Sequence, residues 1–108
     1  MSSRRRRATG AFYHVEIPPE VADIVRSLPP EIKRQIKQSL IQLSESPQVG
    51  KPLIEELAGL RSFRARRFRI VYQLAESERR LLVLHVGHRR TIYEELVRRL
   101  TDTEGEHA

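Results

Sequence analysis

The chain has 108 residues, of which 39% are hydrophobic and 31% charged, a composition typical of one soluble globular domain with a modest core. Its net charge of +6 comes mostly from arginine, which pairs with phosphate and stacks on bases, so we expect a nucleic acid or an acidic protein as partner. The absence of cysteine excludes disulfides and thiolate chemistry, and the absence of a long apolar run or secretory signal predicts a cytoplasmic protein without membrane contact.

The first segment, residues 1–10, carries four consecutive arginines at positions 4–7 between small polar residues. It has little apolar surface to bury, so we expect a disordered basic arm. The arm either adds non-specific affinity for nucleic acid or is a solvated tail, and the sequence leaves both readings open. We expect the folded domain over residues 11–101 and a polar tail at residues 102–108.

A strand and two helices are predicted for the first half of the domain. Residues 12–17 alternate between apolar and polar, as in a half-buried strand. Apolar residues then recur at helical spacing over 21–28 and over 32–43, and a proline pair precedes each of these stretches. The two helices are expected to form an αα-hairpin. Lys33, Arg34 and Lys37 lie off the apolar stripe, on a face that is either solvated or in contact with a large anionic partner.

Three strands and a last helix are predicted for the second half. Residues 48–59 are expected to form a loop with one turn of helix at 53–57. A β-meander follows over residues 60–86, and apolar residues at helical spacing predict a helix at 91–100. The order β-α-α-β-β-β-α predicts an α+β domain. Its antiparallel meander sheet carries the helical hairpin on one face, and the first strand joins the sheet as a parallel or edge strand.

The first hairpin of the meander carries a charge conflict. If Arg66 and Arg67 are the two turn residues, Arg64 lies directly opposite Arg69 on one sheet face, and the apolar side chains share the other face. Opposed like charges destabilise a sheet, a cost that a phosphate-binding site would explain. The alternative is that both arginines extend into solvent. Two-residue turns favour glycine or asparagine, so the Arg-Arg turn is the weakest part of this register.

Three short motifs follow one another in this region: Leu60-Arg61-Ser62-Phe63-Arg64, Phe68-Arg69-Ile70-Val71-Tyr72-Gln73, and Val86-Gly87-His88-Arg89-Arg90 with Tyr93. In their order and spacing they resemble the RelE branch of the RelE/ParE toxin superfamily. The likeness covers roughly residues 13–100. It implies a RelE-like fold and the toxin half of a type II toxin–antitoxin system. It further implies an mRNA interferase that enters the ribosomal A site and cuts the mRNA there. The implied partners are the ribosome, the mRNA and a cognate antitoxin, which would form a hetero-oligomer with the toxin.

The resemblance also implies roles for single residues. Arg69 matches the arginine that contacts the scissile phosphate, and Arg89 matches a second phosphate contact and candidate acid. Tyr93 matches the residue that stacks on or orients the target nucleotide, and Arg64 matches a basic residue of the preceding strand. Some RelE toxins have lysines in that strand, where this chain has arginines together with Ser62. Further candidate RNA contacts are Arg61, Arg66, Arg67, Arg90, Lys33 and Lys37.

Cleavage of RNA by its own 2′-hydroxyl needs a base, an acid and an offset for the charge of the phosphorane. Arginine suits the third task but stays protonated, so it is not an ordinary base. His88 is the preferred candidate base, because an imidazole titrates near neutral pH. Tyr93 or a group of the ribosome are alternatives, and His85 is expected to be packed in a strand. We expect neither a metal nor a cofactor.

Two other functions remain open at this point. A ParE-like inhibitor of DNA gyrase would share the fold but would cut nothing. A catalytically degenerate toxin would only bind its antitoxin. The arginine cluster with Tyr93 favours the nuclease, because ParE-like chains as a group lack that site.

Overall fold

The computed structural model describes residues 12–107, so the basic arm predicted at residues 1–10 lies outside the described part. The helices and strands follow one another as β1 (His14–Glu16), α2 (Pro19–Arg26), α3 (Pro30–Glu45), β2 (Lys51–Pro52), β3 (Arg61–Ala65), β4 (Phe68–Ala75), β5 (Arg80–His88) and α4 (Ile92–His107). Short 3-10 turns at Pro47–Val49, Glu55–Leu57 and Glu76–Glu78 connect some of them. No helix within residues 12–107 is long and apolar enough to cross a membrane.

The sheet has the strand order β1-β5-β4-β3-β2. Strand β1 pairs in parallel with β5, and all other neighbours are antiparallel. This confirms the α+β class, the antiparallel meander and the parallel addition of the first strand. Two expectations need correction. Residues 51–52 were expected in a loop but form β2, and the last helix was expected to end at Leu100 but continues to His107.

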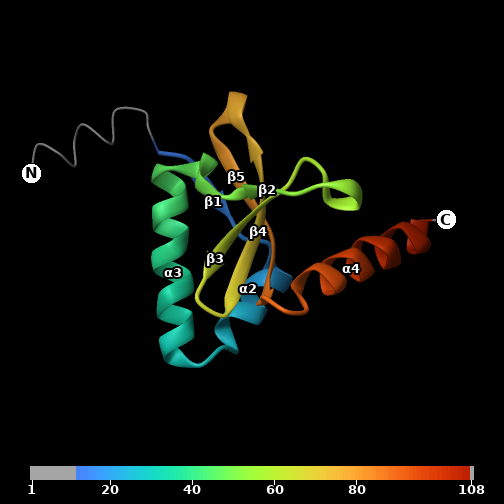
Figure 1. Cartoon of the computed structure of the whole chain (residues 1–108), viewed down its shortest axis with the longest axis horizontal. Coiled ribbons are helices and arrows are strands. Elements are labelled where there is room, and N and C mark those ends of the chain that lie inside the picture. The colour runs from blue at the N-terminus through green and yellow to red at the C-terminus, as the bar shows by residue number, and fades with distance from the viewer. Residues whose placement is uncertain (1–11, 108) are drawn as a thin grey trace, which may run out of the picture.

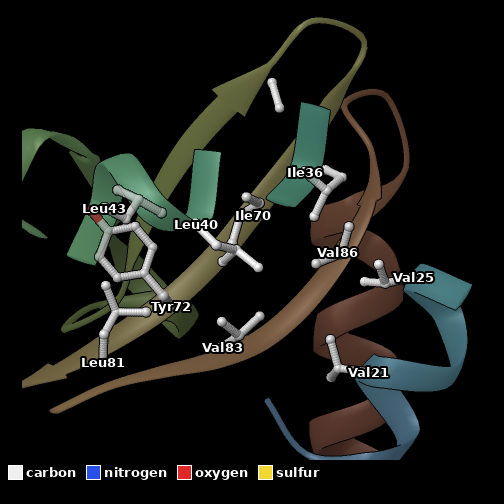
Figure 2. Close-up of a cluster of buried hydrophobic side chains, with 11 residues drawn as sticks. Val21, Val25, Ile36, Leu40, Leu43, Ile70, Tyr72, Leu81, Val83 and Val86 are labelled. Carbon is white, nitrogen blue, oxygen red and sulfur yellow. The ribbon is translucent and has the colours of Figure 1, made fainter. Parts of the chain in front are cut away.

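Helices cover both faces of the sheet, which lies between α3 and α4 in Figure 1. The α2–α3 hairpin packs on one face, as predicted from its apolar stripes, and encloses the main core. Figure 2 shows the side chains of this core converging from α2, α3, β4 and β5. On the opposite face, α4 buries a smaller cluster made of Leu57, Val71, Ile92 and Leu96. The arginines at the β3–β4 hairpin therefore share their sheet face with α4.

The β3–β4 hairpin has the predicted register. Arg64 pairs with Arg69 and Ala65 pairs with Phe68, so Arg66 and Arg67 are the turn residues. Arg66 has a φ of 58°, a conformation in which glycine would be relaxed and arginine is not. The register is therefore determined by the alternation of apolar side chains on the two flanking strands. Its cost is backbone strain at Arg66 in the turn.

A bulge interrupts the pairing of β4 with β5. Val71 pairs with His85 whereas Tyr72 pairs with Val83, which leaves Leu84 as the extra residue. One extra residue moves every following side chain to the other sheet face. Val83 and Val86 consequently both point into the main core.

Tyr72 fixes the connection between α3 and β2 to the sheet. Its buried hydroxyl donates to the Pro47 carbonyl at 2.7 Å and accepts from the Gly50 N–H at 3.0 Å. Burial raises the pKa of this phenol, and the Gly50 N–H and the charge of Arg61 only partly oppose that. Arg61 adds a hydrogen bond to the Gly50 carbonyl at 2.7 Å. Together these bonds hold residues 47–50 against β3 and β4.

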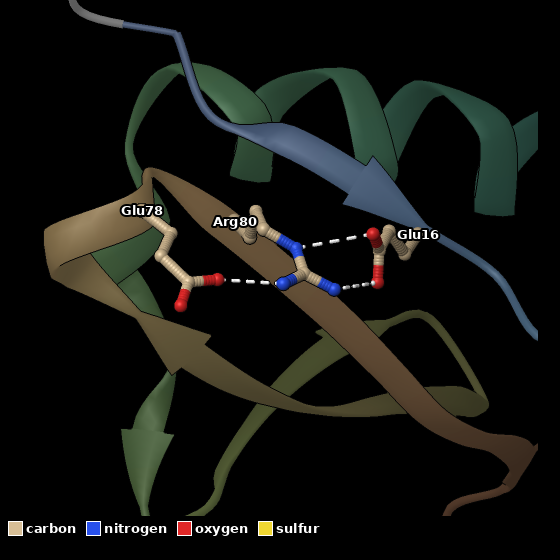
Figure 3. A network of polar contacts seen from close by, with 3 residues as sticks. All are labelled: Glu16, Glu78 and Arg80. Carbon is tan, nitrogen blue, oxygen red and sulfur yellow. Dashed lines mark hydrogen bonds and ion pairs between the residues drawn. The ribbon is translucent and has the colours of Figure 1, made fainter.

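A surface ion network joins β1 to the rest of the sheet. Arg80 donates to both carboxylate oxygens of Glu16, at 2.6 and 3.1 Å, and to Glu78 at 2.6 Å, as Figure 3 shows. The hydrogen bond from Arg80 lowers the pKa of Glu16. The network lies in solvent, so its contribution to stability is small.

Candidate active site

Two of the predicted site residues, Arg69 and Tyr93, donate hydrogen bonds to the same buried hydroxyl, that of Ser62. The Arg69 Nη1 atom on β4 donates to Ser62 Oγ at 3.2 Å, and the Tyr93 hydroxyl on α4 donates to the same Ser62 Oγ at 3.0 Å. Ser62 lies on β3 with only 2% of its surface exposed, whereas Arg69 and Tyr93 are half-buried. Three elements thus bring a cation and a phenol together at the surface of the α4 face.

Arg64 extends the positive charge of this face. It is exposed and lies opposite Arg69, and its Nε atom donates to the Arg66 carbonyl at 3.1 Å. The two guanidinium groups therefore bind different acceptors, which relieves part of the repulsion between them. Among residues 12–101, whose side chains the structure describes, no carboxylate forms an ion pair with either arginine. Their charges are left for an external anion.

A second basic group lines a cavity of about 320 Å³ at the same end of the sheet. The cavity is formed by Arg67, His88, Arg89 and Arg90. The Arg89 N–H donates to the Arg67 carbonyl at 2.7 Å, which ties the end of β5 to the hairpin turn. Four basic side chains around one cavity form an anion-binding surface.

The candidate base His88 is on the other side of the sheet from Arg69. His88 pairs with Phe68, with ring centroids 5.8 Å apart, whereas Arg69 pairs with Gly87. Paired residues of an antiparallel sheet share a face and successive residues alternate. His88 therefore points to the α2–α3 face, and the structure joins it to Arg89 and Arg67 rather than to Arg69 and Tyr93.

The other candidate RNA contacts are spread over the molecule. Arg61 binds the carbonyls of Gln48 and Gly50 and so has a structural role in this conformation. Arg66 borders a cavity with residues of α3. Lys33 and Lys37 lie on α3, which packs on the sheet face opposite to Arg69.

Comparison with known proteins identifies the family of a chain with this site. A family profile described as the ParE toxin of the type II toxin–antitoxin system parDE matches residues 13–93. The chain belongs to this toxin family. The toxin is 37% identical to Toxin RelG of Mycobacterium tuberculosis over 71 residues, which span 64% of this chain and 82% of RelG. It is 30% identical to Toxin RelE of the same organism over 83 residues, which span 75% of this chain and 86% of that toxin.

Solved structures of RelE toxins have the same fold as this toxin. A chain of the toxin–antitoxin complex RelBE2 from Mycobacterium tuberculosis aligns with a TM-score of 0.67 at 32% identity, covering 72% of this chain and 99% of that one. A variant of Escherichia coli toxin RelE in its free state aligns with a TM-score of 0.66 at 23% identity, covering 82% and 97% of the two chains. These likenesses confirm the resemblance to RelE-like toxins and the predicted fold.

In this toxin a polar network holds α4, and with it Tyr93, against the sheet. His85 on β5 is 5% exposed, and its Nε2–H donates to Glu95 Oε1 at 3.0 Å. Arg99 donates to His85 Nδ1 and to the Leu84 carbonyl, both at 2.9 Å. Thr91 donates to the second oxygen of Glu95 at 2.9 Å. The expectation that His85 is packed is confirmed, and its hydrogen bonds add a role in orienting α4.

Gly87 leaves room for the Glu95 carboxylate against β5. A Cβ atom at this position would lie 2.8 Å from Glu95 Oε1, whereas its 3.5 Å separation from side-chain atoms of Ile92 is an ordinary contact. A side chain there would therefore displace the carboxylate and disturb its hydrogen bond with His85.

The network makes part of the stability depend on pH. Partial burial opposes the charge of Glu95, but the hydrogen bonds from His85 and Thr91 outweigh it and lower the pKa of the carboxyl group below its ordinary value of about 4.5. A lowered pKa in the folded state gives stability that is complete above pH 4.5 and is lost as pH falls through the folded pKa. We expect the thermal midpoint of the toxin to fall between pH 5 and pH 3.

The Glu95→Gln variant is the test of this origin. Glutamine keeps the acceptor for His85 but has no charge to lose. Its thermal midpoint should be lower than that of the wild type at pH 7 and should fall less steeply between pH 5 and pH 3. Equal slopes for both proteins, measured by circular dichroism, would assign the acid sensitivity to other carboxylates, Glu16 first among them.

Proposed function

We propose that this toxin is a ribosome-dependent mRNA endonuclease that acts in the cytoplasm without a metal or cofactor. Its nucleophile would be the 2′-hydroxyl of the mRNA in the A site. The observation that carries the proposal is the shared hydrogen bonding of Arg69 and Tyr93 to Ser62, beside the unpaired charge of Arg64. A cation for the phosphate and an aromatic ring for the base are thereby held on one surface. The relation to toxins RelE and RelG supports the same function.

Each residue then has a task in the reaction. The 2′-hydroxyl loses its proton as its oxygen attacks the phosphorus, the bond to the 5′-oxygen breaks, and the 5′-oxygen takes up a proton, for which Arg89 is the candidate donor. The upstream product ends in a 2′,3′-cyclic phosphate, and the downstream product ends in a 5′-hydroxyl. Arg69 and Arg64 would offset the charge of the phosphorane, and Arg89 would hold the phosphate from the neighbouring cavity. Tyr93 would stack on or orient the nucleotide whose hydroxyl attacks.

The general base is proposed to be a group of the ribosome, and no longer His88, which the sequence favoured. Because His88 lies on the α2–α3 face, we propose that the 2′-hydroxyl loses its proton to a group of the ribosome. The toxin would supply charge and orientation, and the ribosome would supply the base. Such a division gives a chemical reason for cleavage that needs ribosomes.

The His88→Ala variant tests this assignment. Loss of a general base costs about 10²-fold or more in rate. We expect the cleavage rate of His88→Ala to fall by less than about tenfold, through weaker phosphate binding in the cavity with Arg89. A fall of about 10²-fold with unchanged binding to ribosomes would return the base to His88.

We propose a cognate antitoxin as the partner of the toxin and a toxin–antitoxin hetero-oligomer as its resting form. The aligned RelBE2 chain comes from a toxin–antitoxin complex, which supports this partner. The unpaired arginines of the α4 face suit an acidic segment of the antitoxin.

The experiment for the proposed function is primer extension on mRNA in a reconstituted translation reaction. The proposal expects cuts within codons at the A site that depend on ribosomes. A ParE-like gyrase inhibitor is the alternative, favoured by the name of the matching family profile. Intact mRNA together with inhibited supercoiling by gyrase would establish that alternative. Intact mRNA and unaffected gyrase would indicate a toxin that only binds its antitoxin.

A further inference from the structure

Ser62 is the point where the two half-buried groups of the candidate active site are joined. Its Oγ atom accepts from Arg69 Nη1 at 3.2 Å and from the Tyr93 hydroxyl at 3.0 Å. A hydroxyl has two acceptor lone pairs, so these two donors use both of them. The two bonds limit the separation of the guanidinium and phenol atoms to about 6 Å.

The connection spans elements that are far apart in the sequence. Ser62 and Arg69 lie on the two strands of one hairpin, whereas Tyr93 comes from α4, 31 residues after Ser62. The buried hydroxyl of Ser62 is held in place by the backbone pairing of β3 with β4. Flexible arginine and tyrosine side chains that bind it lose much of their freedom before any substrate arrives.

Arg64 provides a contrast on the same face. It binds the carbonyl of its own turn at 3.1 Å, whereas Arg69 binds the same hydroxyl as Tyr93, so Arg69 is the arginine held near the phenol. The fold thereby distinguishes two adjacent arginines of equal charge. Arg69 is the one placed at a fixed distance from the residue that would meet the nucleotide.

We propose that Ser62 is a positioning residue for RNA cleavage, an inference that rests on the proposed function. Ser62 does not touch the reacting atoms. It fixes the positions of the Arg69 and Tyr93 side chains relative to each other. The guanidinium can then contact the scissile phosphate while the ring contacts the adjacent nucleotide. Misplacement of such groups by about 1 Å costs about 10²-fold in rate without a matching loss of affinity.

The test is single-turnover cleavage of mRNA on ribosomes that are stalled with a defined codon in the A site, with the full-length toxin in excess. We expect Ser62→Ala to lower the maximal rate by about tenfold to a hundredfold, with a half-saturating toxin concentration within about twofold of the wild type. Ser62→Thr keeps the hydroxyl and should recover most of the rate. Ser44→Ala, which removes a serine hydroxyl on α3 that donates to a backbone carbonyl, is the matched control and should cleave like the wild type.

A double mutant separates positioning from a general structural effect. In the Tyr93→Phe background the phenol no longer binds Ser62, so Ser62→Ala should cost less than in the wild type. Thermal midpoints of all variants show whether each is folded under the assay conditions. Full additivity of the two substitutions, a wild-type rate for Ser62→Ala, or a loss seen only as weaker binding would each overturn the inference. A wild type that leaves mRNA intact would instead refute the proposed function on which the inference rests.

Discussion

Replacement of Arg69 by alanine is expected to lower mRNA cleavage by about 10²-fold to 10³-fold, because the phosphorane loses its best-placed charge. Arg69 is held by Ser62 at 3.2 Å next to Tyr93, and no carboxylate within the described side chains of residues 12–101 pairs with it. Removal of its side chain also relieves the repulsion from Arg64 across the hairpin. We therefore expect the variant to be at least as stable as the wild type.

The prediction for Arg69→Ala therefore combines a loss of activity with an unchanged or higher stability. Primer extension in a reconstituted translation reaction measures the first, and urea unfolding measures the second. Arg34→Ala is the matched control, because it removes an exposed arginine from α3, on the other side of the sheet. Equal losses of cleavage in Arg69→Ala and Arg34→Ala would reduce the role of Arg69 to general attraction of RNA.

Replacement of Gly50 by alanine is expected to lower the free energy of unfolding by about 2–3 kcal/mol. The backbone at Gly50 has φ −68° and ψ 154°, which any residue adopts, so conformational strain does not contribute. The cost comes from overlap, because the new Cβ atom would clash with the Tyr72 hydroxyl and lie 2.9 Å from two ring carbons. Tyr72 is fully buried and has little room to retreat.

Tyr72→Phe shows whether this overlap is the cause. Alone it removes the hydroxyl and leaves the Gly50 N–H and the Pro47 carbonyl without their partner, at about 1–3 kcal/mol. Combined with Gly50→Ala, it frees space for the methyl group, so the double variant should be more stable than the two single losses predict. Gly59→Ala measures the cost of backbone strain without overlap, because Gly59 has open space around it but a φ of 94°. Urea unfolding of the four variants measures all these differences.

The sequence predicted the hairpin register correctly although the turn residues argued against it. Four apolar side chains, Phe63, Ala65, Phe68 and Ile70, have to face the α2–α3 hairpin, and only a turn at 66–67 allows this. Burial on one face outweighed the poor turn chemistry of Arg66. Helices α2 and α3 were equally accessible to prediction, because a proline pair marks the start of each and an apolar stripe marks its buried side.

Features without a periodic pattern escaped prediction. Strand β2 has two residues, too few for alternation to be recognised, and the last turns of α4 have no apolar stripe. The bulge at Leu84 lies at the end of the continuous apolar run 81–84, where no alternation exists to reveal a shift in register. Because the bulge decides which way His85 and His88 point, their roles could not be derived from the sequence. The contact between Ser62 and Tyr93 likewise depends on how α4 packs, for which a single serine in a strand gives no signal.

The short outer strands have a consequence for the toxin in the absence of its partner. Strand β1 has three residues, and β2 has two, one of which is Pro52, which has no N–H to donate. Long, unpaired outer strands are templates on which further chains add and aggregate. Here β1 and β2 each offer only a few free backbone groups, so a further chain has little to extend along them. Within the described residues, β1 pairs with β5 only over 80–82, so the part of β5 beyond it, 83–88, is where an added strand would pair.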